Sequence, residues 1–165
     1  MDFLQQNLKG QNNLQKTDIL SLNFDELLEA VSEIGEKKFR ATQIFEWLHI
    51  KKVTDFSQMT NLSAALREKL EEKFYITNVD VIRKLVSKDG TVKYLFGLPD
   101  GTAVESVVMN YKHGNSLCIS TQVGCKMGCS FCASGIGGFK RQLAPSEILS
   151  QIYTAQKDLG IRISR

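Results

Sequence analysis

The period of the hydrophobic pattern changes near Phe74, and this change restricts the fold of the chain more than any other feature. Before Phe74, apolar residues recur at the spacing of one buried helix face. After Phe74, Val, Ile and aromatic residues alternate with polar ones, which is typical of half-buried strands. We therefore expect a small helical unit followed by a unit that contains a β-sheet.

Three helices are predicted in the first part of the chain. The first has Asn23 as its N-cap, Glu26 at the capping-box position and Gly35 as its C-terminal stop. A second helix runs from about Ala41 to His49. A third begins near Leu62 and places leucines at every fourth position, so that one face is apolar.

Three strands are predicted directly after the helices, at residues 76–87, 91–98 and 102–110. Turn sequences separate them at Lys88-Asp89-Gly90 and Pro99-Asp100-Gly101. Because the connections are short, neighbouring strands are expected to be antiparallel, which gives a β-meander.

The last fifty residues have the pattern strand, loop, helix, strand. A strand near residues 116–121 enters a Gly-rich loop, a helix follows from Pro145 to Gly160, and residues 161–163 open another strand. We expect a parallel βαβ unit, with four apolar helix residues buried: Ile148, Leu149, Ile152 and Leu159. A lone βαβ unit leaves its sheet edges unpaired, so the chain is expected to be a piece of a longer α/β protein.

The Gly-rich loop contains Cys125, Cys129 and Cys132, whereas Cys118 lies apart in a predicted strand. Three thiols crowded together favour a metal or redox site over a disulfide framework. A structural zinc site requires four closed ligands. A cubane iron–sulfur cluster can be held by three thiolates, which leaves one iron open to an outside ligand. The spacing therefore favours an iron–sulfur cluster, with zinc as the alternative.

The CxxxCxxC spacing, with Phe131 before the last cysteine, resembles the signature of radical S-adenosylmethionine enzymes. The flanking stretches "SLCISTQVGCKMGCSFCASG" and "GFKRQLAPSEILSQI" resemble the RlmN/Cfr family of RNA methyltransferases. The stretch "KFRATQIFEWLHIKKVTDFSQMTNLSAALREKL" is similar to the amino-terminal helical domain of that family. Several blocks in the same order make this resemblance more specific than the cysteines alone.

The resemblance implies a fold that is α+β and then α/β. A helical RNA-binding-like domain would occupy residues 21–75 and a linking β-meander residues 76–113. Before them, the polar and Gln/Asn-rich composition of residues 1–20 predicts a flexible leader. Residues 114–165 would begin a radical-SAM (β/α) barrel and contain its first βαβ unit. The rest of that barrel would lie beyond Arg165, so these residues alone are not expected to methylate RNA.

The resemblance also implies the cofactors, a [4Fe-4S] cluster and S-adenosyl-L-methionine. Cys125, Cys129 and Cys132 would ligate the cluster, and Phe131 would lie beside the adenosylmethionine. The expected reaction methylates C2 of adenosine in 23S rRNA and in tRNA, through a methyl-cysteine located beyond Arg165. An electron donor such as flavodoxin would transfer electrons to the cluster. The protein would act as a monomer.

Glu105 corresponds to the family's proton acceptor. In the predicted strand it shares a face with Ala103 and Val107, and a carboxylate in apolar surroundings is costly unless it is paired or used. Desolvation there would favour a general base. The alternative is a strand carboxylate that is paired with Lys93 or Lys112.

Cys118 corresponds to the family's second functional thiol, whose partner would be the methyl-bearing cysteine. From its own pattern, Cys118 would be a small buried hydrophobic residue in a strand. The assignment of a catalytic role to Cys118 therefore depends on the resemblance.

Charge is distributed unevenly along the chain, because residues 74–165 hold 11 Lys/Arg and 6 Asp/Glu, which is a net +5. This bias suits an RNA partner, although a solvated basic surface is the more common reason for it. Candidate phosphate contacts are Lys37, Lys38, Arg40, Lys51, Lys52, Arg83, Lys84, Lys93, Lys140 and Arg141. The last two lie beside the cysteine loop and would serve RNA binding or loop anchoring.

No stretch resembles a signal peptide or a membrane span, so a cytoplasmic location without membrane contact is expected. Two other functions compete with the C2 methyltransferase. One is a Cfr-type enzyme that methylates C8 of adenosine. The other is a non-catalytic RNA-binding module with a structural metal site.

Overall fold

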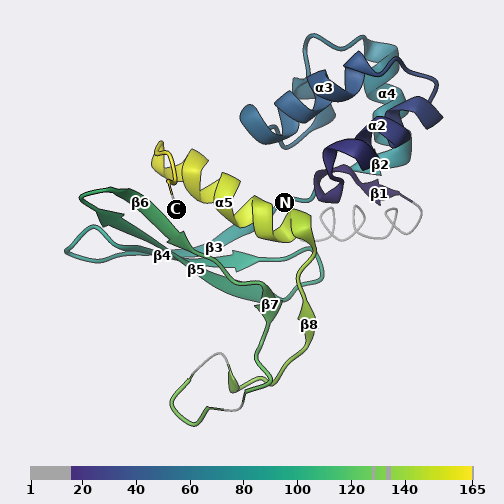
Figure 1. Cartoon of the computed structure of the whole chain (residues 1–165). Coiled ribbons are helices and arrows are strands. Elements are labelled where there is room, and N and C mark those ends of the chain that lie inside the picture. Colours follow the sequence, from purple (N-terminus) through teal and green to yellow (C-terminus); the bar gives the residue numbers. More distant parts are fainter. Residues whose placement is uncertain (1–15, 128, 133–134, 165) are drawn as a thin grey trace, which may run out of the picture. The chain divides into compact units, whose positions relative to one another are not determined.

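The computed structural model of the chain describes residues 16–127, 129–132 and 135–164. It contains two compact units, Met1–Thr77 and Asn78–Arg165, and Figure 1 shows the elements of each. Residues 1–15 of the predicted leader lie outside the described residues.

The first unit is mainly helical, as predicted. Its core is formed by apolar side chains that include Leu27, Ile44 and Leu66, each at most 2% exposed. Its elements are β1 (Thr17–Asp18), η2 (Ile19–Ser21), α2 (Phe24–Glu33), α3 (Phe39–Phe45), η3 (Glu46–Ile50), η4 (Phe56–Gln58), α4 (Ala64–Lys73) and β2 (Phe74–Tyr75).

The predicted ends of the first helix are confirmed. Asn23 Oδ1 accepts from the Glu26 N–H at 3.0 Å, and Glu26 Oε2 accepts from the Asn23 N–H at 2.7 Å. This reciprocal pair satisfies two backbone donors at the start of α2 that the helix leaves without partners. Gly35 follows α2 with a φ of 78°, a left-handed conformation that favours glycine.

The first unit begins earlier than the predicted boundary at residue 21. Ile19 is completely buried and Leu20 is 4% exposed. Asp18 accepts a hydrogen bond of 2.5 Å from the Thr77 hydroxyl, and β1 pairs in parallel with β2. Ile19 and Leu20 therefore belong to the core of this unit, and β1 before them is part of its structure rather than of a leader.

The second unit contains a four-stranded sheet with the strand order β3-β4-β5-β6. All neighbouring strands are antiparallel, which confirms the predicted meander. The strands and the helix of this unit are β3 (Asp80–Val86), β4 (Val92–Gly97), β5 (Ala103–Tyr111), β6 (Gly114–Cys118), β7 (Gln122–Val123), β8 (Arg141–Gln142) and α5 (Pro145–Leu159).

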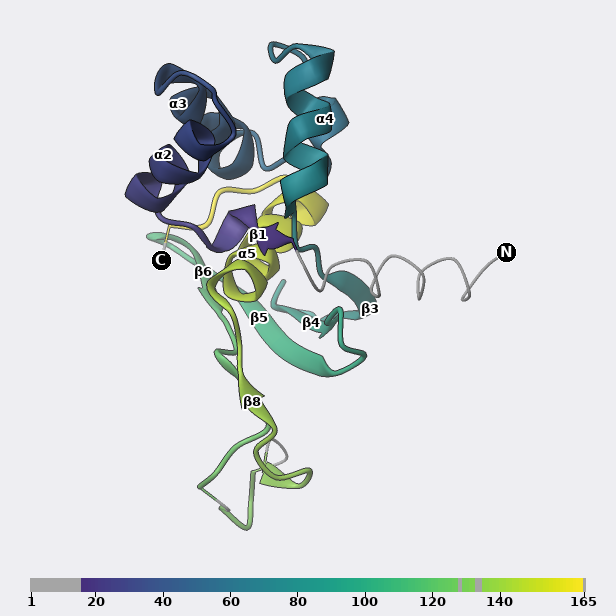
Figure 2. The same cartoon turned by 90° about the vertical axis from the view of Figure 1, so that its right-hand side faces the viewer.

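Helix α5 lies across one face of this sheet, as Figures 1 and 2 show. Buried apolar side chains of the strands, among them Phe96, Val104 and Val108, form a core with Ala155 of the helix. Because successive strand residues point to opposite faces, the odd-numbered residues of β5 face away from this core.

The predicted division at residue 114 does not separate two compact units. Strand β6 begins there, and it is the edge strand of the meander sheet, paired with β5 from Tyr111↔Gly114 to Val107↔Cys118. The predicted βαβ connection is represented by one parallel bridge between Asn115 and Ile163, after α5. The complete barrel stays a prediction.

The buried face of α5 agrees only in part with the predicted one, since Ile148 and Leu159 pack against the sheet core. Ile148, Leu149, Ile152 and Leu159 are only partly buried, whereas Ser146, Glu147, Ser150, Gln151 and Ala155 are buried. The prediction assigned apolar residues to the interior by period alone. The structure also buries polar side chains, because Glu147 and Gln151 find hydrogen-bond partners there.

Asp158 joins the C-terminal end of α5 to the sheet and should make stability depend on pH. Its carboxylate accepts hydrogen bonds of 2.5 Å from Lys84 and from Tyr94, and these bonds lower the pKa of Asp158. A lowered folded-state pKa adds stability above the ordinary carboxyl pKa, and this stability is lost as the pH falls through the folded value.

We predict that Asp158→Asn lowers the urea midpoint of unfolding at neutral pH, and that its difference from the wild type narrows at acidic pH. Urea denaturation followed by circular dichroism at several pH values measures this. A difference that is equally large at all pH values would contradict the assignment.

Candidate functional site

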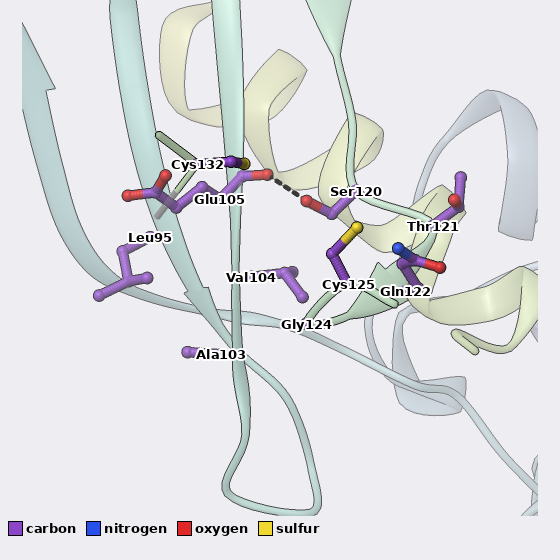
Figure 3. A pocket seen from close by; sticks show the side chains of 10 residues that line it. All are labelled: Leu95, Ala103, Val104, Glu105, Ser120, Thr121, Gln122, Gly124, Cys125 and Cys132. Atoms are coloured by element: carbon purple, nitrogen blue, oxygen red, sulfur yellow. Dashed lines mark hydrogen bonds between the residues drawn. The ribbon is translucent and has the colours of Figure 1, made fainter. Parts of the chain in front are cut away.

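A pocket of about 560 Å³ lies on the second unit, where the sheet meets the chain that leads into the cysteine loop (Figure 3). Its lining side chains come from β4, from β5 and from the segment that begins after β6. They are Leu95, Ala103, Val104, Glu105, Ser120, Thr121, Gln122, Gly124, Cys125 and Cys132. The pocket therefore brings residues of the meander together with residues of the cysteine loop.

The cysteine loop leaves the sheet through a narrow neck. Strands β7 and β8 pair antiparallel at its base, and the Lys140 N–H donates to the Val123 carbonyl at 2.9 Å. A further bond of 2.9 Å runs from the Leu143 N–H to the Thr121 carbonyl. The described part of the loop projects away from the sheet beyond this neck (Figures 1 and 2).

Gly124 and Gly138 cross at the top of the neck. A Cβ at Gly124 would overlap the Gly138 carbonyl oxygen, and Gly124 has a φ of 73°. Glycine is therefore required at Gly124 both by backbone conformation and by the close approach of the opposite limb. Next to the crossing, the Lys126 ammonium lies 4.3 Å from the centre of the Phe139 ring. This cation–π contact is a second connection between the two limbs.

The structure brings two of the three loop cysteines to the pocket. Cys125 and Cys132 line it and are partly buried, whereas Cys129 is exposed and is absent from its lining. The Cys132 N–H donates to the Cys129 carbonyl at 3.1 Å, so these two residues are joined by a turn. Among the described residues, no three Cys, His, Asp or Glu side chains are grouped so that they could hold a metal ion.

The chemistry of these side chains nevertheless suits an iron–sulfur cluster. All four cysteines are free thiols, and three of them lie within one loop. Thiolates are soft ligands that bind iron–sulfur clusters and zinc. Cys125 and Cys132 line one pocket, so binding of a cluster would require the three thiols to approach one another within the loop. Gly128, one of the loop glycines, lies outside the described residues.

Phe131 does not line the pocket. Its side chain is 91% exposed, and Met127 and Ile136 of the same loop are 78% and 87% exposed. The loop therefore presents apolar side chains to solvent between its cysteines and after them.

Glu105 reaches the pocket, but its surroundings differ from those expected. It projects from the sheet face opposite α5, and its side chain is 54% exposed rather than desolvated. The Glu105 carboxylate forms an ion pair of 2.7 Å with Lys93, the residue named in the alternative interpretation. The expectation of a desolvated carboxylate is wrong, because this face of the sheet is open where Glu105 lies.

Cys118 is exposed rather than buried. It pairs with Val107 at the last position of the β5–β6 ladder, and directly paired residues in an antiparallel ladder share a face. Cys118 therefore lies on the same open sheet face as Glu105, although it is absent from the pocket lining.

Arg141 anchors the returning limb of the loop. Its guanidinium donates two hydrogen bonds of 2.7 Å to the Glu147 carboxylate of α5 and another of 2.7 Å to Asp100 in the turn before β5. These bonds lower the pKa of Asp100 and raise the pKa of Arg141. Of the two roles predicted for Arg141, the structure therefore favours loop anchoring over contact with RNA.

Two polar residues near the pocket were missed from the sequence. Ser120 lines the pocket, and Gln151 of α5, which is completely buried, bonds to both backbone groups of Ser120. A polar residue beside the apolar face of a helix is usually assigned to solvent, so no pattern in the sequence indicated these contacts.

Comparison with known proteins identifies the first unit. Residues 17–76 match the family described as "Ribosomal RNA large subunit methyltransferase N-terminal domain", RlmN_N. The matched range covers nearly all of the described part of the first unit, which runs to Thr77. The resemblance to the RlmN/Cfr family is confirmed.

Similarity to curated proteins extends into the second unit. The chain is 53% identical over 155 residues to a protein of Lachnoclostridium phytofermentans, covering 93% of this chain and 44% of that protein. It is 55% identical over 141 residues to a protein of Geobacillus thermodenitrificans, covering 86% of this chain and 39% of that protein. Both bear the name "Probable dual-specificity RNA methyltransferase RlmN". The chain thus spans less than half the length of these relatives.

A solved structure agrees with these relationships. A radical SAM methyltransferase from Sphaerobacter thermophilus matches 90% of this chain with a TM-score of 0.82 and 34% sequence identity. The match covers 45% of that protein. In the described part of this chain, no helix is long and apolar enough to cross a membrane.

The crossing of the two loop limbs gives a direct test of the neck. We predict that Gly124→Ala opens the neck, because the new methyl group would overlap the Gly138 carbonyl and the backbone conformation would be strained. The expected loss of unfolding free energy is about 1–3 kcal/mol, with faster reaction of Cys125 toward a thiol reagent. Gly137→Ala is the matched control, since a Cβ there meets no atom within 4 Å. If the two variants have equal unfolding free energies and equal rates of Cys125 reaction, glycine is not required at position 124.

The anchor at Arg141 gives a second test. We predict that Arg141→Ala lowers the free energy of unfolding by about 2 kcal/mol, because the Glu147 side chain, only 9% exposed, would lose its charged partner. Adding Glu147→Gln removes the unpaired charge and should recover part of the loss. Denaturant titration of both variants measures this. A double variant less stable than Arg141→Ala by the full cost of a second substitution would show that the two side chains are not coupled.

Proposed function

We propose that the chain contributes the cysteine loop and part of the reaction site of a radical S-adenosylmethionine enzyme that methylates RNA. One observation carries the proposal: Cys125 and Cys132 of the cysteine motif line the same pocket as Glu105. The relatives named as RNA methyltransferases and the radical SAM methyltransferase of similar structure support it.

Cys125, Cys129 and Cys132 are the proposed ligands of a [4Fe-4S] cluster, and Phe131 is proposed to pack against S-adenosyl-L-methionine. When bound, these cofactors supply the electron and the radical chemistry that side chains cannot supply. The narrow neck holds the two limbs of the loop together, and the exposed Phe131 leaves an apolar surface available for a nucleoside.

Glu105 is the proposed proton acceptor. Its carboxylate lines the pocket and is open to solvent, so a docked base could bring its proton within reach. The base would enter beside the ion pair of Glu105 with Lys93, whether or not the Lys93 ammonium moves away. Cys118 is proposed as the thiol that assists release of the product, and it lies on the same open face of the sheet.

The proposed substrate position is C2 of adenosine in 23S rRNA and in tRNA, with a methyl-cysteine carried beyond this chain. A Cfr-type reaction at C8 is the alternative, and the relatives named RlmN favour the first. A flavodoxin-like electron donor, a monomeric state and a cytoplasmic location remain predictions.

The basic residues differ in their availability to RNA. Lys84 is paired with Asp158, Lys93 with Glu105 and Arg141 with Glu147. These three side chains would have to give up an ion pair to contact phosphate. Lys37 and Lys38, at the start of α3, are exposed and are better candidates.

Metal analysis of protein prepared without oxygen tests the proposal. We predict about four iron and four sulfide per chain after reconstitution. Cys129→Ala should lose most of this iron, whereas Cys118→Ala should retain it. Of these two cysteines, only Cys129 is a proposed ligand of the cluster. One zinc per chain in place of iron would support the structural module instead. Equal loss of iron from both variants would refute the assigned ligands.

A further inference from the structure

The β5–β6 ladder ends where the pocket begins. The last pair is Val107↔Cys118, and the next residues of the chain, 119–121, belong to no strand. Had the ladder continued, Ser120 would lie opposite Glu105. The chain instead separates from β5 here, and the pocket is lined by the two diverging segments. Some interaction other than backbone pairing must therefore fix their separation.

The side chain of Gln151 makes the two bonds to Ser120 that a strand partner would have made. Its Oε1 accepts from the Ser120 N–H at 3.1 Å, and its Nε2 donates to the Ser120 carbonyl at 3.0 Å. A residue in a hydrogen-bonded antiparallel pair makes the same two bonds to its partner. The amide of Gln151 thus replaces one rung of the ladder, although it comes from a helix.

Gln151 is held in turn by β5 and by its own helix. Ser106 of β5 donates its hydroxyl to Gln151 Oε1 at 2.7 Å, and Gln151 Nε2 also donates to the Glu147 carbonyl at 3.1 Å. The donors and carbonyls around the amide determine which end is oxygen and which is nitrogen. Gln151 is completely buried, so each of these bonds would be costly to leave unmade.

A second bond closes the connection to the proposed proton acceptor. The Ser120 hydroxyl donates to the backbone carbonyl of Glu105 at 2.7 Å, as Figure 3 shows. Gln151 therefore reaches the backbone of Glu105 through Ser120, and it reaches the adjacent Ser106 directly. The same Ser120 lies five residues before Cys125.

We propose that Gln151 is a positioning residue that sets the distance and register between Glu105 and the cysteine loop. It touches neither the pocket nor any thiol, and it acts through the backbone of Ser120. This inference rests on the proposed function, since Glu105 and Cys125 must act on one substrate for their separation to matter. A buried amide suits this task because its bonds have fixed directions, whereas an apolar side chain of the same size would permit sliding.

Gln151→Met removes all four hydrogen bonds while nearly preserving volume. The matched control is Tyr94→Phe, which removes one partly buried hydrogen bond between the sheet and the opposite end of α5, at Asp158. Both variants should unfold at lower denaturant concentration. Only Gln151→Met should increase amide hydrogen exchange at Ser120, by about tenfold or more, and raise the labelling rate of Cys125 relative to Cys118.

The reconstituted full chain provides a spectroscopic measurement. We expect Gln151→Met to change the paramagnetic resonance spectrum of the reduced cluster and to lose its iron sooner than the wild type. Tyr94→Phe should match the wild type in both measurements. If Gln151→Met behaves like Tyr94→Phe in Ser120 exchange and in relative labelling of Cys125, the positioning role is refuted. If the wild type takes up no iron, the proposed function fails, and the exchange and labelling measurements still decide the role of Gln151.

Gln151→Glu is the second test of the contact with Ser120, to be used if Gln151→Met does not fold. A protonated glutamic acid can still donate to the Ser120 carbonyl, whereas the carboxylate cannot. Exchange at Ser120, corrected for its intrinsic pH dependence, should therefore approach the wild-type value at acidic pH and exceed it when the new carboxyl is ionised. If the ratio of the Ser120 exchange rates in this variant and in the wild type does not change with pH, the proposed contact is refuted.

Discussion

Burial of polar side chains at the N-terminal half of α5 is the interaction on which the rest of the second unit depends. Glu147 binds Arg141 on the returning limb of the cysteine loop, and Gln151 binds Ser120 on the entering limb. One helix turn therefore holds both ends of the loop. Because each buried group would be costly without its partner, the two limbs have one favoured arrangement against the helix.

This arrangement separates a rigid base from an open tip. At the base, Gly124 and Gly138 cross so closely that no side chain fits between them. At the tip, Met127, Phe131 and Ile136 are exposed, and Cys129 is free. In the proposed function, the tip would have to arrange the three cysteines around the cluster, while the base holds the entering limb at Gly124.

Local chemistry made much of the fold predictable. The capping box at Asn23, the two Gly-containing turns of the meander and the proline at the start of α5 each act over a few residues, and each was identified correctly. The environment of Glu105 was not predictable in this way, since it depends on which sheet face α5 covers. Ile148 and Leu159 of α5 pack against the sheet core as predicted, but burial of Glu147 and Gln151 was missed, because it depends on hydrogen bonds rather than on hydrophobicity. The motif predicted a shared site for three thiols, and the structure places two of them in the pocket.

The open face of the sheet explains why the pocket requires a separate means of positioning. A core would fix Glu105 by packing on all sides, but Glu105 is half exposed and its ion pair with Lys93 is exposed as well. Ion pairs of this kind contribute little and permit movement. Fixed geometry must then come from the backbone of β5, which is tied to α5 on its covered face through Ser106 and to the loop through Ser120. The polar contacts with Gln151 thus lie on the covered side of the sheet, where the amide is completely buried, while the face that carries Glu105 is open to solvent.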